Sequence, residues 1–148
     1  MFALLEKYKN KGSFEFRAPD SLKIICNAPK TKGCIYMVYH LFEKENLIYI
    51  GSSGWVNQDG SLGLRNNGMW DRIVNGKQTF ILNGIETTDK RCNIWKRKMK
   101  EDGIEKLRVD WFVTYNEEIK HIPAFAEATL IQQYFDVQGK LPSWNKCF

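Results

Sequence analysis

GCIYMVYHLFEKENLIYIG, residues 33–51, is the stretch of sequence that decides the fold. Its first part, CIYMVYHLF, is a run of β-branched and aromatic residues typical of a largely buried strand. A charged link at 43–46 separates it from a second short apolar run, LIYIG, which ends at Gly51. We therefore expect an antiparallel hairpin that places Tyr36 and Tyr49 on neighbouring strands.

Downstream of this hairpin, the sequence predicts two helices, a strand and a last helix. Residues 69–76 have apolar side chains at helical spacing and end at a glycine, and residues 93–102 repeat this pattern. The stretch 107–115, LRVDWFVTY, alternates apolar and polar residues and is the clearest strand in the chain. Proline at the first position begins a final helix that runs from 123 to about 136.

The remaining segments are interpreted as an arm and two loops. Residues 1–32 are expected to pack on or beside the core, and SLKIICNAP within them fits a short helix or an edge strand equally well. Residues 52–68 and 78–90 are interpreted as loops that carry specificity. The predicted architecture is α+β, a small three-stranded sheet flanked by helices in the order β-β-α-α-β-α, with one domain over 33–148 and an N-terminal extension.

Composition narrows the class of protein. The 148 residues fit one domain, and 43% hydrophobic with 14% aromatic residues excludes a disordered chain. No apolar run approaches the roughly 18 residues of a membrane span, and no signal peptide is recognisable, so we expect a cytoplasmic protein with no membrane partner. Four well-separated cysteines without a CxxC pair indicate reduced thiols rather than a zinc site. A net charge of +5 favours an anionic partner such as nucleic acid.

Glu127 is the first residue that could carry chemistry. Leu130, Ile131 and Tyr134 lie three, four and seven residues further along its predicted helix, so the carboxylate shares an apolar face. A lone buried carboxylate is costly unless a cation compensates it. Glu127 is therefore either a salt-bridged residue at the edge of that face or a metal ligand, because Mg²⁺ is often held by one carboxylate with waters and substrate phosphate.

Other polar residues have two interpretations each. Tyr36 and Tyr49 are ordinary cross-strand aromatics unless their hydroxyls converge. Arg65 and Arg72 are either solvated surface charges or the fork that binds a phosphate.

Together, these residues resemble the GIY-YIG nuclease family. The resemblance rests on GCIY ending in Tyr36, on Tyr49-Ile50-Gly51, on an arginine in the following helix, on Glu127 in a late helix and on Asn145 near the end. It covers residues 33–145 and agrees with the predicted order of strands and helices.

The resemblance implies hydrolysis of a phosphodiester with one divalent metal, Mg²⁺ or Mn²⁺, held by Glu127. It implies that Tyr36 positions or deprotonates the attacking water and that Tyr49 lies nearer the scissile phosphate. Gly51 would let the backbone turn sharply out of its strand. The arginine would stabilise the transition state, and Asn145 would support the site.

Three features depart from the family pattern. Cys34 stands where the first motif has glycine. Arg65 and Arg72 compete for the role of the family arginine, and Arg72 is favoured because it lies in the predicted helix. The His or Tyr that many members carry one turn after this arginine is missing; Lys77 is a candidate substitute, and His40 is a second one that fits an ordinary surface or core histidine better.

The expected function is a metal-dependent DNA endonuclease of restriction or phage type, without an organic cofactor. Cutting both strands at one locus would need a homodimer. Six basic residues on or beside the second predicted helix are expected to contact backbone phosphates, although a solvated basic face explains them too; they are Lys90, Arg91, Lys96, Arg97, Lys98 and Lys100. The alternative function is a catalytically silent nucleic-acid-binding module with the same fold.

Overall fold

The computed structural model describes residues 2–148 and shows an α+β protein built on one antiparallel four-stranded sheet. In chain order the elements are η1 (Ala3–Lys7), β1 (Lys11–Arg17), α1 (Leu22–Ile25), β2 (Gly33–Leu41), β3 (Glu45–Ser53), β4 (Trp55–Val56), β5 (Leu62–Gly63), α2 (Gly68–Asn75), β6 (Lys77–Leu82), β7 (Ile85–Lys90), α3 (Arg91–Asp102), β8 (Lys106–Tyr115) and α4 (Pro123–Gln138). The predicted hairpin, α2, α3, β8 and α4 are confirmed within a few residues.

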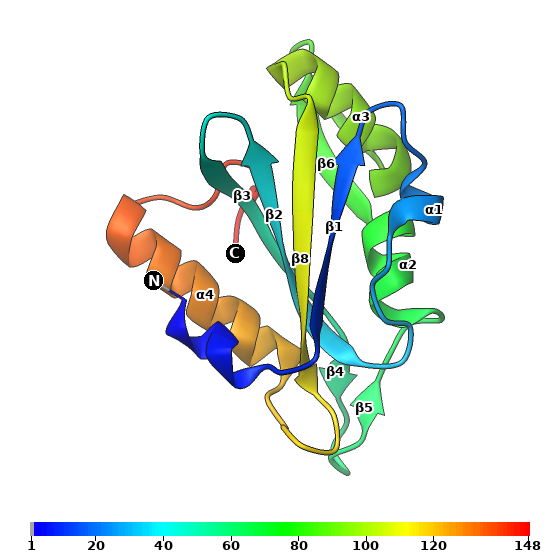
Figure 1. Ribbon diagram of the computed structural model, residues 1–148, viewed down its shortest axis with the longest axis vertical. Helices are drawn as coiled ribbons and strands as arrows, with labels where there is room; N and C mark the ends of the chain where they lie inside the picture. Colours follow the sequence, from blue (N-terminus) through cyan, green and yellow to red (C-terminus); the bar gives the residue numbers. More distant parts are fainter. Residues whose placement is uncertain (1) are drawn as a thin grey trace.

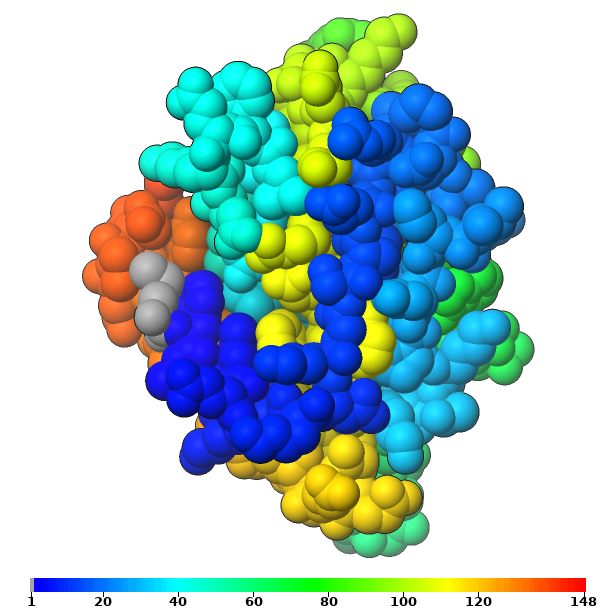
Figure 2. All heavy atoms as spheres, in the orientation of Figure 1, coloured from blue at the N-terminus to red at the C-terminus, as the bar shows by residue number. Residues whose placement is uncertain are grey.

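The prediction of a three-stranded sheet is wrong. The sheet has the order β1-β8-β2-β3, and its fourth strand comes from the N-terminal arm. Phe14 and Phe16 of β1 are 7% and 0% exposed, whereas their neighbours Ser13 and Glu15 face solvent. This alternation covers only a few residues between Lys11 and Arg17, which is why the sequence pattern did not reveal it. Figure 2 shows the N-terminal segment crossing the whole of one face beside β8.

The two segments predicted as loops also contain strands. Residues 77–90 form the hairpin β6–β7, whose turn residues Asn83 and Gly84 have φ of 51° and 79°. An Asn-Gly pair between two apolar runs is the strongest short-range hairpin signal, because both turn residues need positive φ. The longer segment 52–68 contains the short pair β4–β5. The ambiguous SLKIICNAP segment forms the short helix α1.

Two apolar layers lie on opposite faces of the sheet (Figure 1). On one face, α4 and the N-terminal residues pack on β2 and β3 through Ile35, Met37 and Ile50. On the other face, α1, α2 and α3 pack around Tyr36 and Trp95. Because β2 is paired on both sides, by β3 and β8, its first six residues are buried. The predicted strand at 33–42 is therefore the centre of the protein.

Two expectations about helix length and cysteine pairing can be compared with the structure. No helix in residues 2–148 is long and apolar enough to cross a membrane. The cysteines are free, as expected: Cys26, Cys34, Cys92 and Cys147.

The position of β1 gives a first prediction. Replacing Phe16, which is fully buried, by alanine should lower the free energy of unfolding by about 3–5 kcal/mol, because less apolar surface is buried and a cavity remains. The exposed neighbour Glu15, changed to alanine, should cost less than about 1 kcal/mol. Urea denaturation of both variants measures the difference. Similar small costs for both would show that the arm does not belong to the folded core.

Candidate active site

The two motif tyrosines come together on the paired strands β2 and β3. Their ring centroids lie 5.7 Å apart at an interplanar angle of 39°. Tyr36 is opposite Gly51 in the β2–β3 register. A Cβ on Gly51 would lie 2.6 Å from Cζ and 2.7 Å from Oη of Tyr36, distances that real Cβ contacts do not show. Gly51 is thus required by the close approach of the Tyr36 ring, and the expected sharp turn at this glycine is not observed, because Gly51 lies within β3.

The Tyr36 hydroxyl is an anomaly in a well-packed core. It is buried and has no hydrogen-bond partner among the protein atoms of residues 2–148. Burial raises the pKa of Tyr36 far above its ordinary value, and the nearby charge of Arg91 only partly opposes this shift. Leaving a buried hydroxyl unpaired costs about 1–3 kcal/mol, so its presence points to a role other than stability.

Glu127 reaches this region from α4 on the other face of the sheet. Its Oε1 accepts a hydrogen bond of 2.9 Å from Ser52 Oγ, near the end of β3. Burial raises the pKa of Glu127, while the Ser52 hydrogen bond and the charges of Arg72 and Arg91 lower it. Within the described residues Glu127 forms no ion pair and its Oε2 accepts no hydrogen bond.

The unused Oε2 atom of Glu127 is a candidate ligand for the expected metal ion. No group of three or more His, Cys, Asp and Glu side chains that could bind a metal occurs in residues 2–148. Mg²⁺ commonly takes one or two carboxylates and fills its other positions with water and phosphate oxygens. A half-buried carboxylate with one unused oxygen fits that demand, and Glu127 is the residue that would hold the ion.

The structure separates the two competing arginines. Arg65 Nε forms a salt bridge of 2.7 Å with Asp71 Oδ2. Arg72, in α2, has a buried Nε with no acceptor among the described protein atoms, and its charge acts on both Tyr36 and Glu127. Arg72 therefore has the unused donors next to the tyrosines and the carboxylate.

Asn145 holds the outer edge of β3. Its Oδ1 accepts from the backbone N–H of Ile50 and its Nδ2 donates to the carbonyl of Ile50, both at 3.0 Å. The neighbouring Trp144 N–H donates to the carbonyl of Ile48 at 2.8 Å. One side-chain amide thus imitates a paired strand next to Tyr49, which fixes the backbone that carries the tyrosine.

Lys77 and His40 form no hydrogen bond or ion pair with this cluster in the part of the chain that the structure describes. Lys77 is exposed at the start of β6, opposite Lys90, and forms no hydrogen bond or ion pair with the tyrosines, Arg72 or Glu127 in the described chain. His40 is stacked with Phe42, and it lies four residues beyond Tyr36 along β2, about 13 Å at the usual rise of a strand.

Arg91 is the site residue that sequence reasoning misplaced. It is 1% exposed and not on the basic surface where we expected it. Its Nη2 donates to Tyr49 Oη at 3.2 Å, and its Cζ lies 5.6 Å and 6.0 Å from the ring centroids of Tyr49 and Tyr36. Burial alone would lower the pKa of Arg91, but Tyr36, Tyr49 and Glu127 raise it above its ordinary value, so the guanidinium stays charged. The sequence did contain a signal for the burial of Arg91. Trp95 and Met99, four and eight residues further along, lie on the same helix face and are apolar.

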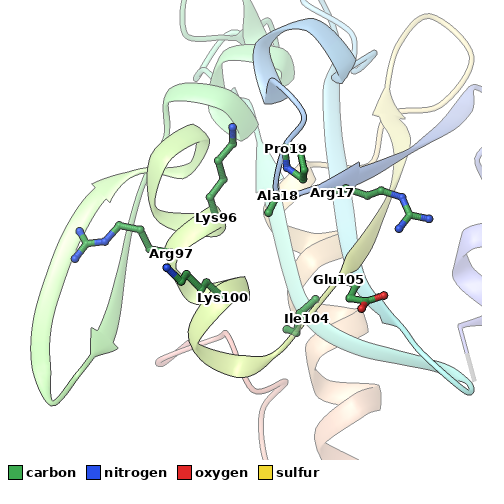
Figure 3. A pocket seen from close by; sticks show the side chains of 8 residues that line it. All are labelled: Arg17, Ala18, Pro19, Lys96, Arg97, Lys100, Ile104 and Glu105. Carbon is green, nitrogen blue, oxygen red and sulfur yellow. The ribbon is translucent and has the colours of Figure 1, made fainter.

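The other basic residues of α3 divide into two groups. Lys98 pairs with Glu101 and Asp102. Figure 3 shows a different arrangement, in which α3 and the end of β1 form the two walls of a pocket of about 620 Å³. Its lining contains four cations and one carboxylate around an apolar floor: Arg17, Ala18, Pro19, Lys96, Arg97, Lys100, Ile104 and Glu105. None of these cations forms a salt bridge within residues 2–148. We call this pocket the basic groove.

Comparison with known proteins adds no relative. No protein-family model matches the chain, and no curated protein or solved structure is significantly similar to it.

The raised pKa of Glu127 gives a second prediction. Because the native state binds this proton more tightly than the unfolded chain, the ionised carboxylate destabilises the fold at neutral pH. Glu127→Gln should therefore unfold at a higher denaturant concentration than wild type at neutral pH. The advantage should shrink as the pH falls through the native pKa of Glu127 towards its ordinary value of about 4.3.

The exposed Glu118, changed to glutamine, is the matched control. Urea titrations across this pH range should show no such trend for Glu118→Gln. A stabilisation by Glu127→Gln that is the same at every pH would contradict the assigned shift.

Proposed function

We propose that this protein is a metal-dependent endonuclease that hydrolyses phosphodiester bonds of DNA with Mg²⁺ or Mn²⁺. The observation that carries the proposal is the convergence of Tyr36, Tyr49, Arg72 and Glu127. They come from β2, β3, α2 and α4, yet the charges of Arg72 and Glu127 act on one another and Arg72 acts on Tyr36. Packing alone gives no reason to gather an unpaired hydroxyl, an unpaired guanidinium nitrogen and a half-buried carboxylate.

The chemistry of this set suits phosphoryl transfer. Arg72 keeps donors for the phosphoryl oxygens, on which negative charge increases in the transition state. A divalent ion bound at Glu127 would polarise the phosphate and lower the pKa of a coordinated water. Ser52 orients the carboxylate through its hydrogen bond to Oε1 and leaves Oε2 available.

The tyrosines have separate tasks in this proposal. Because burial raises the pKa of Tyr36, its hydroxyl carries a proton at neutral pH, so in this proposal it acts as a hydrogen-bond donor and not as a base. Tyr49 is half-buried and is the more accessible of the two, so we assign it to the phosphate.

A nucleic-acid substrate is supported by the distribution of charge. The net charge is +5, and three of the four unpaired cations of the basic groove, Lys96, Arg97 and Lys100, lie on α3, whose first residue is Arg91. Unpaired cations that line one pocket can contact several phosphates of a polyanion. In this proposal the groove contacts backbone phosphates other than the scissile one.

A second candidate function is the catalytically silent binding module. It is favoured by one observation, namely that the Tyr36 hydroxyl is shielded from solvent. The two candidates differ in turnover and agree on binding.

Metal-dependent cleavage is the decisive test. Supercoiled plasmid incubated with wild type and Mg²⁺ should be cut, and either a chelator or Glu127→Ala should reduce the rate by about 100-fold or more. Glu118→Ala, which removes an exposed carboxylate, should cut like wild type.

Gel shift in the presence of chelator completes this test. Glu127→Ala should bind DNA at least as tightly as wild type, because without metal the site carboxylate repels phosphate. Cleavage unchanged in Glu127→Ala would reject the site. Binding without cleavage by wild type would favour the silent module.

The basic groove gives a separate prediction about affinity. A triple alanine variant at Arg17, Arg97 and Lys100 should lower the slope of log affinity against log salt by about 0.9 for each phosphate that is no longer neutralised, about 2.7 in all. Fluorescence anisotropy with a labelled duplex and chelator measures this slope.

The matched control removes the same net charge outside the groove. It replaces the exposed Lys44, Lys140 and Lys146 by alanine and should leave the slope nearly unchanged. Equal slopes for the two triple variants would show that net charge, and not the groove, attracts DNA.

A further inference from the structure

The buried Arg91 connects three parts of the proposed active site. It lies at the first position of α3, and each nitrogen of its guanidinium donates to a different acceptor. Nη2 donates to Tyr49 Oη at 3.2 Å, Nη1 donates to the carbonyl of Arg72 at 2.8 Å, and Nε donates to Gln78 Oε1 at 3.0 Å. With 1% exposure, the side chain cannot reach a bound substrate directly.

We infer that Arg91 is a positioning residue that makes Tyr49 a hydrogen-bond donor to the scissile phosphate. This inference rests on the proposed nuclease function. A guanidinium has five N–H donors and no acceptor, so in its contact with Tyr49 the tyrosine oxygen must accept. The single Tyr49 proton is then available to a second acceptor, either the substrate or the neighbouring Tyr36 hydroxyl. A charged donor also polarises the O–H group and makes it a stronger donor in turn.

The same guanidinium fixes Arg72 relative to Tyr49. The Arg72 carbonyl lies in the last turn of α2, and the backbone N–H of Arg91 donates to the carbonyl of Gly76, just after that helix, at 2.9 Å. The end of α2 and the start of α3 are thus joined by two hydrogen bonds. Tyr49 and Arg72, on separate elements, are therefore held to one rigid planar group.

Two neighbours keep the guanidinium in this orientation. Gln78 Oε1 accepts from both Arg91 Nε and Trp95 Nε1, each at 3.0 Å, which leaves the Nη atoms to Tyr49 and Arg72. Gly76 leaves the room that Nη1 occupies, since a Cβ at this position would overlap both Nη1 of Arg91 and the carbonyl of Arg72. The space around Arg91 is arranged for this one rotamer.

The test is a double-mutant cycle on turnover of a DNA duplex. Arg91→Met should lower kcat by about 10- to 100-fold with little change in KM, because Arg91 acts through Tyr49 and does not touch the substrate. In a Tyr49→Phe background, Arg91→Met should cost much less, since the hydroxyl that it positions is already absent. Arg91→Lys keeps the charge and one donor nitrogen, so it should recover part of kcat. It also replaces Arg91→Met in the cycle if the methionine variant does not fold.

Arg108→Met is the matched control. Arg108 also lies over a tyrosine, with its Cζ 4.5 Å from the Tyr39 ring centroid, and it pairs with Asp110 away from the site. Its loss should reduce stability without changing kcat.

Each result decides between specific statements. A non-additive loss of kcat supports the positioning role. Additive losses of kcat, a rise in KM alone, or a folded Arg91→Met variant with full kcat would overturn the positioning role. The proposed nuclease function would stand in each of these cases, because wild type still cleaves. Absence of cleavage by wild type would remove the proposed function, and this inference with it.

Discussion

The close packing of Tyr36 against Gly51 is the constraint on which the rest of the site depends. A side chain at position 51 would collide with the Tyr36 ring, so this pair fixes how β2 and β3 align. A slip of one residue would reverse the faces of every side chain on the edge strand. In the observed register Tyr49 faces the layer with α2 and α3, while Ile50 faces α4 and the next residue on that face, Ser52, meets Glu127. One contact between a ring and a glycine therefore determines which groups can approach one another.

Around that contact the protein accepts unfavourable electrostatics. Tyr36 has an unpaired buried hydroxyl, Arg72 an unpaired buried Nε, and Glu127 a carboxyl group whose pKa burial raises. A core selected only for stability would replace such groups by apolar ones. The charges of Arg72 and Arg91 offset part of the cost, since both lower the pKa of Glu127. Unpaired polar groups and only partly compensated charges are typical of a site that binds a further charged group. A phosphate with a divalent ion would be such a group.

The sequence predicted the parts of the fold in which local pattern and tertiary burial agree. The apolar runs of β2 and β3 and the alternation in β8 extend over enough residues to be recognised. The start of α4 was recognised from its proline. It missed β1, where Phe14 and Phe16 are the only buried residues in a polar segment, and β6–β7, although Asn83-Gly84 signalled the turn. Arg91 was assigned to the surface because it belongs to a basic run. Its burial depends on Gln78 and Tyr49, which are distant in sequence and meet only in the folded chain.

Gly76 connects one departure from the family pattern with the architecture of the site. It lies one turn after Arg72, where the sequence resemblance leads us to expect a histidine or tyrosine. A side chain there would overlap the Arg91 guanidinium, so the absence of a larger residue at 76 and the presence of a buried arginine at 91 are two aspects of one arrangement. The space beside Arg72 is filled from α3 instead of from the end of α2. A buried, permanently charged donor in that space cannot accept a proton, so Arg91 cannot replace a histidine or tyrosine there as a general base.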